Sequence, residues 1–241
     1  MSNFDRAASR AAIIARYRPV RASIQRVLAQ AVGTCRKADF ERAAKHLDLM
    51  HEMELDDPEV INMLSDVALF ERNQRGRRVV DAFIKESLDE LAAGDRDVAQ
   101  RLGTAFFSIF RVADWHDAAG VWVEDLLAHE RRLWLLDEGI EASAQEGMVL
   151  AMRVFDAGSF HAGFGIVVQP DALALELCIS AASRGRPLPV RHSLAASIYG
   201  DAIMVASLRA SIEAEDAHTT RPRSALGRAR PRSASGRAGR R

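Results

Sequence analysis

The sequence is poor in the residues that build covalently or metal-held scaffolds. It has two cysteines, Cys35 and Cys178, among 241 residues, and no CxxC or CxH spacing. These thiols suggest neither a zinc site nor a disulfide framework, and neither a metal nor a cofactor is expected. So few cysteines are typical of a protein of the reducing cytoplasm, which is the predicted location.

Long apolar runs and catalytic motifs are also missing. No run approaches the roughly 18 residues of a membrane span, and the N-terminus lacks the regions of a secretory signal. The N-terminus is rich in arginine and poor in acids, as organellar transit peptides are, although an ordinary first helix is the simpler explanation. No GxSxG, Cys–His or glycine-rich phosphate motif occurs, so no catalytic residue is assigned and a non-enzymatic role is favoured.

Acidic and basic residues are equally frequent, 33 of each, but they are segregated along the chain. Residues 1–38 carry a charge of +7 and residues 219–241 carry +8, so residues 39–218 must carry −15. The net charge of zero therefore hides an acidic body with two basic ends. The last segment contains no acid, and its arginines are Arg221, Arg223, Arg228, Arg230, Arg232, Arg237, Arg240 and Arg241.

Apolar residues recur at the helical period in several segments of the chain. The first segment follows Pro19 and the third follows Asp57 and Pro58, which suit the start of a helix, and the glycine of "AAGD" (92–95) is predicted to end the fourth. Because each amphipathic helix must bury one face, residues 1–103 predict a helical bundle. The six segments are 20–31, 40–50, 60–68, 80–91, 173–181 and 194–208.

From Phe106 the period changes from that of a helix to that of a strand. Short runs of aromatic and β-branched residues are separated by turn residues, with "DWHDAAG" (114–120) typical of a hairpin loop and "AHE" (128–130) of a shorter one. Residues 137–147 are expected to form a connection. Residues 104–170 therefore predict about five antiparallel strands, in a meander that forms a small barrel or a strongly bent sheet.

Two helices are predicted in residues 171–217, and they can pack on the sheet or on the bundle. Residues 218–241 contain one large aliphatic residue, Leu226, and cannot bury enough surface to offset the entropy of ordering, so they are predicted to be disordered. The predicted fold class is α+β. Its parts are a helical domain (1–103), a β-module (104–170), C-terminal helices that pack on the body (171–217) and a disordered basic tail (218–241).

The strand-rich segment resembles a known module. "FSIFRVADWHDAAGVWVEDLLAHERRLWLLDEG", followed by "GMVLAMRVF…GSFHAGFGIVV", is similar to a small β-module of uncharacterised bacterial proteins, some of which carry a metal-binding SEC-C segment. The most distinctive piece is "EDLLAHE" (124–130), and the likeness covers about residues 104–170. This chain has no cysteine cluster, so no zinc site carries over. The resemblance implies a fold for the segment and no activity.

One strand of this module offers the only candidate ligand-binding side chains. In "SFHAGFGIVV" (159–168), His161 shares a strand face with Gly163 and Gly165. Glycines on a strand face leave room for a ligand or, more simply, for a bulky ring such as Trp122 or Trp134. His161 and Trp134 are therefore the candidate ligand-binding residues.

The segment "HLDLMHEMELDD" (46–57) is dense in residues that could bind a metal. His46 and His51 are five residues apart, and on a continuous helix they would diverge by about 140°. A helical metal site instead needs two histidines four residues apart. The segment is therefore predicted to be the solvated end of a helix.

Three functions from different classes remain open. The favoured one is a non-enzymatic adaptor that binds a protein partner. The second is non-specific binding of nucleic acid through the basic N-terminus and the eight tail arginines, although the tail could equally serve solubility, contact the acidic body, or be an extended GC-rich reading frame. The third is a small-molecule site at the β-module. No membrane partner is expected.

Overall fold

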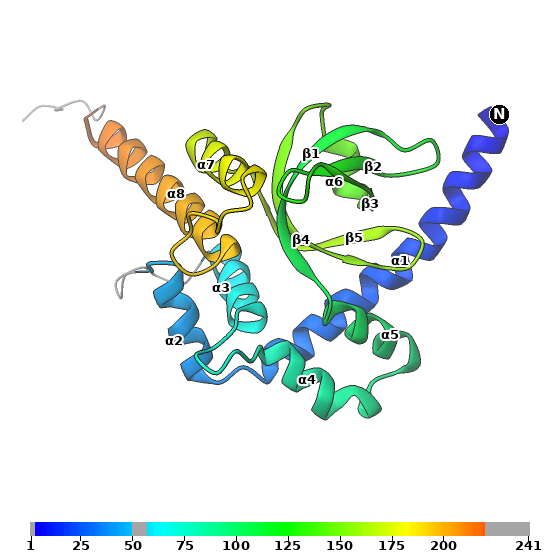
Figure 1. Ribbon diagram of the computed structural model, residues 1–241, viewed down its shortest axis with the longest axis horizontal. Helices are drawn as coiled ribbons and strands as arrows, with labels where there is room; N and C mark the ends of the chain where they lie inside the picture. The colour runs from blue at the N-terminus through cyan, green and yellow to red at the C-terminus, as the bar shows by residue number, and fades with distance from the viewer. Residues whose placement is uncertain (1–2, 50–56, 220–241) are drawn as a thin grey trace, which may run out of the picture. The chain divides into compact units, whose positions relative to one another are not determined.

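The computed structural model describes residues 3–49 and 57–219 (Figure 1). The predicted tail and most of the ligand-dense segment 46–57 lie outside these residues. Five helices precede the strands, and a short 3-10 helix, Leu88–Glu90, separates the fourth from the fifth. The helices are α1 (Asn3–Gly33), α2 (Lys37–His46), α3 (Pro58–Phe70), α4 (Val79–Ser87) and α5 (Ala93–Leu102).

Two of the predicted helix boundaries were wrong. Pro19 lies inside α1 instead of at its start, because Ile14 and Tyr17 are buried one to two turns before it and continue the apolar face. That packing compensates for the backbone hydrogen bond that proline removes. Gly94 lies in the first turn of α5 instead of ending the preceding helix. Asp57 does cap α3 as predicted, since its side chain accepts a hydrogen bond from the Glu59 amide.

The strands form a closed five-stranded barrel in the order β1-β2-β3-β5-β4. Alternate side chains fill its interior, for example Val121 and Val123 of β2 and Leu133 and Leu135 of β3, as the period of two predicts. A six-residue helix, α6 (Glu138–Ser143), covers one end with Ile140. The strands are β1 (Phe106–Trp115), β2 (Val121–Asp125), β3 (Arg131–Leu136), β4 (Val149–Asp156) and β5 (His161–Val168).

The prediction of a purely antiparallel meander was only partly right, because the barrel is mixed. β3 and β5 pair in parallel, with Leu135 opposite His161 and Leu136 opposite Ala162. β4 does not follow β3 in space, since the connection through α6 carries the chain to the far side of β5, where β4 pairs with β1. The other pairings in the barrel are antiparallel.

The helices cover two parts of the barrel wall. α1, α4 and α5 share an apolar cluster with Phe155, Phe160 and Phe164 of the barrel. α3 and the last two helices, α7 (Ala172–Ser183) and α8 (Leu194–Thr219), share another with Ile109 and Ala151. The sequence left open what the C-terminal helices pack on; the start of α8 packs on both helices and barrel.

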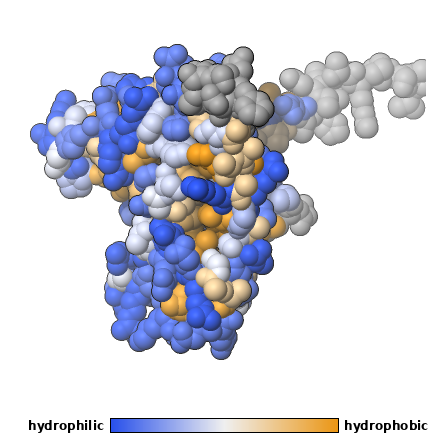
Figure 2. Space-filling view, turned by 90° about the vertical axis from the view of Figure 1, so that its right-hand side faces the viewer, coloured by the Kyte–Doolittle hydropathy of each residue, from blue (hydrophilic) through white to orange (hydrophobic). Residues whose placement is uncertain are grey.

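The chain divides into two units, Met1–Met204 and Val205–Arg241, and the barrel and the sites below belong to the first. On the face shown in Figure 2, hydrophilic residues cover most of the surface and apolar residues show between them in a band down its middle. Within residues 3–49 and 57–219, no helix is long and apolar enough to cross a membrane.

Candidate functional site

The strongest concentration of positive charge in a concave part of the surface lies beside the barrel. Two adjoining cavities of about 740 and 470 Å³ share His46, Arg72 and His192, and we call them together the basic groove. α2, the loop between α3 and α4 and the segment before α8 form most of its walls. Two carboxylates line it, those of Glu41 and Glu71, against seven cationic side chains: Arg42, Lys45, Arg72, Arg75, Arg78, Arg153 and Arg191.

The loop that forms one wall is held by its own hydrogen bonds. The Asn73 side chain accepts from the amides of Arg75 and Arg77 at 2.9 and 3.1 Å, and the Arg72 guanidinium donates to the carbonyl of Gly76 at 2.7 Å. Gly76 has a φ of +72°, which a glycine adopts without strain. The loop therefore presents its arginines from an ordered backbone, so less entropy is lost when they bind a ligand.

The groove's cations differ in how far their charge is already compensated. Arg42 pairs with Asp39 at 2.9 Å, and Arg78 and Arg191 also have carboxylate partners. Arg72, Arg75 and Lys45 make no ion pair within 4 Å of any residue in the described ranges. These three side chains are therefore the ones most able to hold an added anion.

The floor of the second cavity is a buried ion pair. Arg153 of β4 donates two hydrogen bonds to Asp66 of α3, both of 2.8 Å, and its guanidinium lies 4.5 Å from the centre of the Phe70 ring. Glu71 lies 3.9 Å from the same guanidinium, and burial raises the pKa of the Glu71 carboxyl. This floor is rigid because both partners are almost fully buried.

Two imidazoles stack at the junction of the cavities. The rings of His46 and His192 have centroids 4.1 Å apart and planes 9° apart. Burial lowers the pKa of His46, and His192 and Arg42 lower it further. Its Nδ1 is buried and has no hydrogen-bond partner within the described part of the chain. An anion in the groove would favour the charged form of this histidine.

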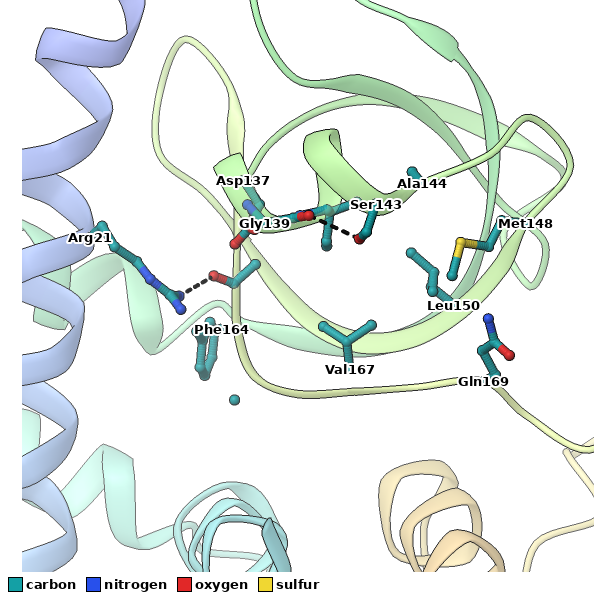
Figure 3. A pocket seen from close by; sticks show the side chains of 13 residues that line it. Arg21, Asp137, Gly139, Ser143, Ala144, Met148, Leu150, Phe164, Val167 and Gln169 are labelled. Carbon is teal, nitrogen blue, oxygen red and sulfur yellow. Dashed lines mark hydrogen bonds between the residues drawn. The ribbon is translucent and has the colours of Figure 1, made fainter. Parts of the chain in front are cut away.

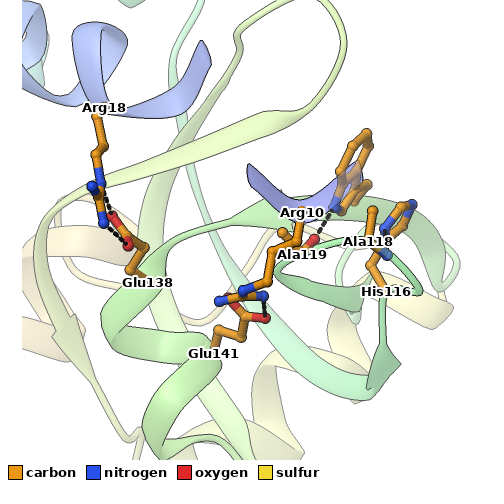
Figure 4. A network of polar contacts seen from close by, with 8 residues as sticks. Arg10, Arg18, His116, Ala118, Ala119, Glu138 and Glu141 are labelled. Carbon is orange, nitrogen blue, oxygen red and sulfur yellow. Dashed lines mark hydrogen bonds and ion pairs between the residues drawn. The ribbon is translucent and has the colours of Figure 1, made fainter. Parts of the chain in front are cut away.

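The two candidate residues of the β-module do not form one site. Leu135 faces the barrel interior opposite His161, so Trp134, its neighbour, lies on the outer face. There the His116 ring stacks on Trp134 at 3.9 Å, and the indole N–H of Trp134 donates to the carbonyl of Ala119 at 2.8 Å (Figure 4). Burial lowers the pKa of His161, whose side chain is half-buried at the start of β5.

The space beside the strand glycines is filled differently from either expectation. A Cβ at Gly163 would lie 3.5 Å from the sulfur of Met152, and one at Gly165 would lie 3.7 Å from Asp66. Neither Trp122 nor Trp134 packs there. The backbone of both glycines lines a separate cavity.

The sequence gave one signal for the groove that the pattern search passed over. "RNQRGRR" (72–78) places four arginines in seven residues between two helices. The other lining residues, from α2, β4 and the segment before α8, are too far apart in sequence to be recognised as one site. Among the described residues, no three His, Cys, Asp or Glu side chains are grouped as metal ligands.

Comparison with known proteins places the chain in a family. A family model described as a family of unknown function, DUF7986, matches residues 12–169. The chain belongs to this family. The match runs from α1 to the end of β5, so the DUF7986 region comprises the N-terminal helices together with the barrel and includes most of the groove. No curated protein and no solved structure matches the chain.

Proposed function

We propose that this protein binds single-stranded nucleic acid through its phosphate backbone, with the basic groove as the contact surface. The observation that carries the proposal is the ratio of seven cationic to two acidic side chains lining the groove. Residues 39–218 as a whole carry −15, so the groove is a local exception in an acidic body. Cations clustered in this way neutralise phosphates and release counterions, which drives binding without reading the bases.

The arginine chemistry of the groove suits phosphates. Arginine presents a planar fork of donors that matches two phosphate oxygens, and Arg72 and Arg75 lie in a loop with an ordered backbone. The tail arginines predicted from the sequence would add flexible, sequence-independent contacts. The resulting binding is expected to be salt-sensitive and weakly specific.

The barrel gives support at the level of topology. The order β1-β2-β3-β5-β4, with a helix between β3 and β4, is that of OB-fold barrels, which bind oligonucleotides and oligosaccharides on strands 2 and 3. On that face Trp122 and Trp134 flank His116, and Arg132 lies over Trp122 at 4.8 Å. Such rings can stack on bases. Since one fold hosts many functions, the likeness supports the proposal and does not carry it.

A salt series tests the proposal. Binding of a labelled single-stranded RNA is measured for the full chain, for residues 1–218, and for Arg72→Gln/Arg75→Gln in the full chain. The double variant should bind more weakly, and its slope of log K against log salt should fall by about 2, one for each lost phosphate contact. The matched control, Lys85→Gln/Arg186→Gln, removes two exposed charges outside the groove and should change the slope little.

Three results would contradict the groove. Equal losses in both double variants would mean that only the overall charge matters. Binding that disappears in residues 1–218 and is unchanged in the groove variant would assign it to the tail alone. Absence of binding at low salt would end the proposal. Arg72→Lys/Arg75→Lys, which keeps the charge, checks that a loss does not come from a disturbed loop.

Protein binding is the second candidate, and an exposed apolar pair favours it. Leu173 and Leu177 lie one turn apart on α7 and are 64% and 49% exposed. Adjacent exposed leucines are typical of docking surfaces. A partner that crosslinks to the wild-type protein and not to Leu173→Ser/Leu177→Ser would support this candidate, whereas equal crosslinking to both would count against it.

A further inference from the structure

A cavity of about 420 Å³ lies between α1, α6 and the strands β4 and β5, away from the basic groove (Figure 3). Its volume is within the range of small-molecule sites. Most of its walls are apolar, and Figure 3 shows Met148, Leu150 and Val167 around its middle. Arg21 and Asp137 lie together at one end, so the cavity has a polar end and an apolar body.

The two charged groups at the polar end are not equally compensated. Asp137 accepts hydrogen bonds from the amides of Gly139 and Ile140 at 2.9 and 3.0 Å and from the hydroxyl of Tyr17 at 3.3 Å. Its negative charge is therefore satisfied by three donors that belong to the fold.

Arg21 has donors to spare. One of its nitrogens donates to the carbonyl of Gly163 at 3.1 Å, which fixes the guanidinium at the cavity wall. A guanidinium has five N–H donors, and with residues in the described ranges Arg21 makes no other hydrogen bond and no ion pair. The polar end can therefore accept a negatively charged group.

The strand that forms one wall is shaped for close approach to its backbone. Gly163 and Gly165 both line the cavity, and the register between β4 and β5 shifts between Ala151 and Arg153, opposite this stretch. Gly165 has a φ of +74°, which a residue with a side chain rarely adopts. Bulges of this kind are frequent beside ligand sites because they redirect the chain.

We propose that this cavity binds a small carboxylic acid with an unbranched or branched apolar body. The carboxylate is held by the free donors of Arg21, and the apolar body lies against Leu150, Met148 and Val167. A neutral ligand would leave the guanidinium donors without a partner, whereas a doubly charged one would place its second charge against apolar walls. This inference does not depend on nucleic-acid binding, since none of the groove residues lines this cavity.

Octanoate and 1-octanol are the probes, since they share a chain and differ in charge. Calorimetric titration of the full-length protein, below the concentration at which octanoate forms micelles, should give saturable binding of octanoate. Octanol should bind at least about tenfold more weakly, because a hydrogen bond to a charged group contributes about 1.5–3 kcal/mol. Equal binding of both, or no saturable binding of octanoate, would overturn the proposal.

Variants locate the site. Arg21→Gln should weaken octanoate binding about tenfold and leave octanol unchanged, while Arg21→Lys should retain much of the affinity. Val167→Trp adds a ring at a position that is 42% exposed and lines the cavity, so it should block octanoate without unfolding the protein. The matched control is Leu177→Trp, on an exposed face of α7 outside the cavity. An equal loss in Leu177→Trp, or full binding in Val167→Trp, would overturn the assignment.

Discussion

The guanidinium of Arg153 and the carboxylate of Asp66 form a two-pronged ion pair between β4 and α3, with side chains only 5% and 4% exposed. The pair joins the barrel wall to the helical part of the chain and supports the floor of the basic groove. A buried pair of this kind is costly to break because the remaining charge has no water to solvate it.

Removing one partner of this pair should therefore be severe. Asp66→Ala is expected to lower the free energy of unfolding by about 3–5 kcal/mol, whereas Asp66→Leu/Arg153→Met should recover most of the loss because no charge stays buried. Urea unfolding measures both. The control, Lys37→Ala, breaks an exposed pair with Glu41 and should cost at most about 0.5 kcal/mol. A single variant as stable as the control would show that water reaches the pair.

Histidine burial makes stability depend on pH. Burial lowers the pKa of His46, His116 and His161 from the ordinary 6.5, so near pH 6 the unfolded chain binds more protons than the folded one. Stability is then complete above about pH 6.5 and falls as the pH drops below that value. Thermal unfolding from pH 7.5 to 5.5 should show this fall, and His46→Gln/His116→Gln/His161→Gln should flatten it. Parallel profiles for the two proteins would contradict the assignment.

Two glycines with the same backbone angle separate strain from crowding. Gly120 and Gly147 have φ values of +79° and +81°, but a Cβ at Gly120 would lie 2.3 Å from the carbonyl oxygen of Leu135, and one at Gly147 would meet nothing within 4 Å. Gly147→Ala should cost about 1–2 kcal/mol from the backbone alone. Gly120→Ala should cost about 1–3 kcal/mol more, because β3 must move. Equal losses in urea unfolding would show that the barrel yields at this point without cost.

Apolar contact, more than charge, is expected to hold α1 in place. Arg10 and Arg18 pair with Glu141 and Glu138 (Figure 4), but these groups are largely exposed apart from Glu141. Glu138→Gln and Glu141→Gln should each cost less than about 1 kcal/mol and less still in 1 M salt. Ile14→Ala, at a buried position of the same helix, should cost about 2–5 kcal/mol. A larger loss from either glutamate would reverse this ranking.

The sequence predicted the elements better than their arrangement. Alternating residues such as Val121, Val123, Leu133 and Leu135 identified the strands because a period of two is a local property. The parallel pairing of Leu135 with His161 could not be seen, since nothing local records which strand a later strand will join. Pro19 was misread as a helix start because packing against distant parts of the chain overrides a local preference.

The candidate sites were harder to predict than the fold. Trp134 and His161 stand out in the sequence, but the strand register places their side chains on opposite faces of the barrel wall. The buried partner of Asp66 is 87 residues away, and Arg21 reaches a carbonyl 142 residues away. Only the arginine run at 72–78 was visible as a local cluster. Sites assembled from distant segments leave no spacing pattern to detect.

The place of β5 between β3 and β4 has a consequence for synthesis on the ribosome. β5 is the last strand to emerge, yet it closes the barrel by pairing with both neighbours. Until residue 168 has left the exit tunnel, β3 and β4 are open edges that can pair with other chains, and Phe155 has no Phe164 to cover it. Nascent chains that stall before His161 should therefore recruit chaperones or aggregate, and those that stall after the barrel closes should not.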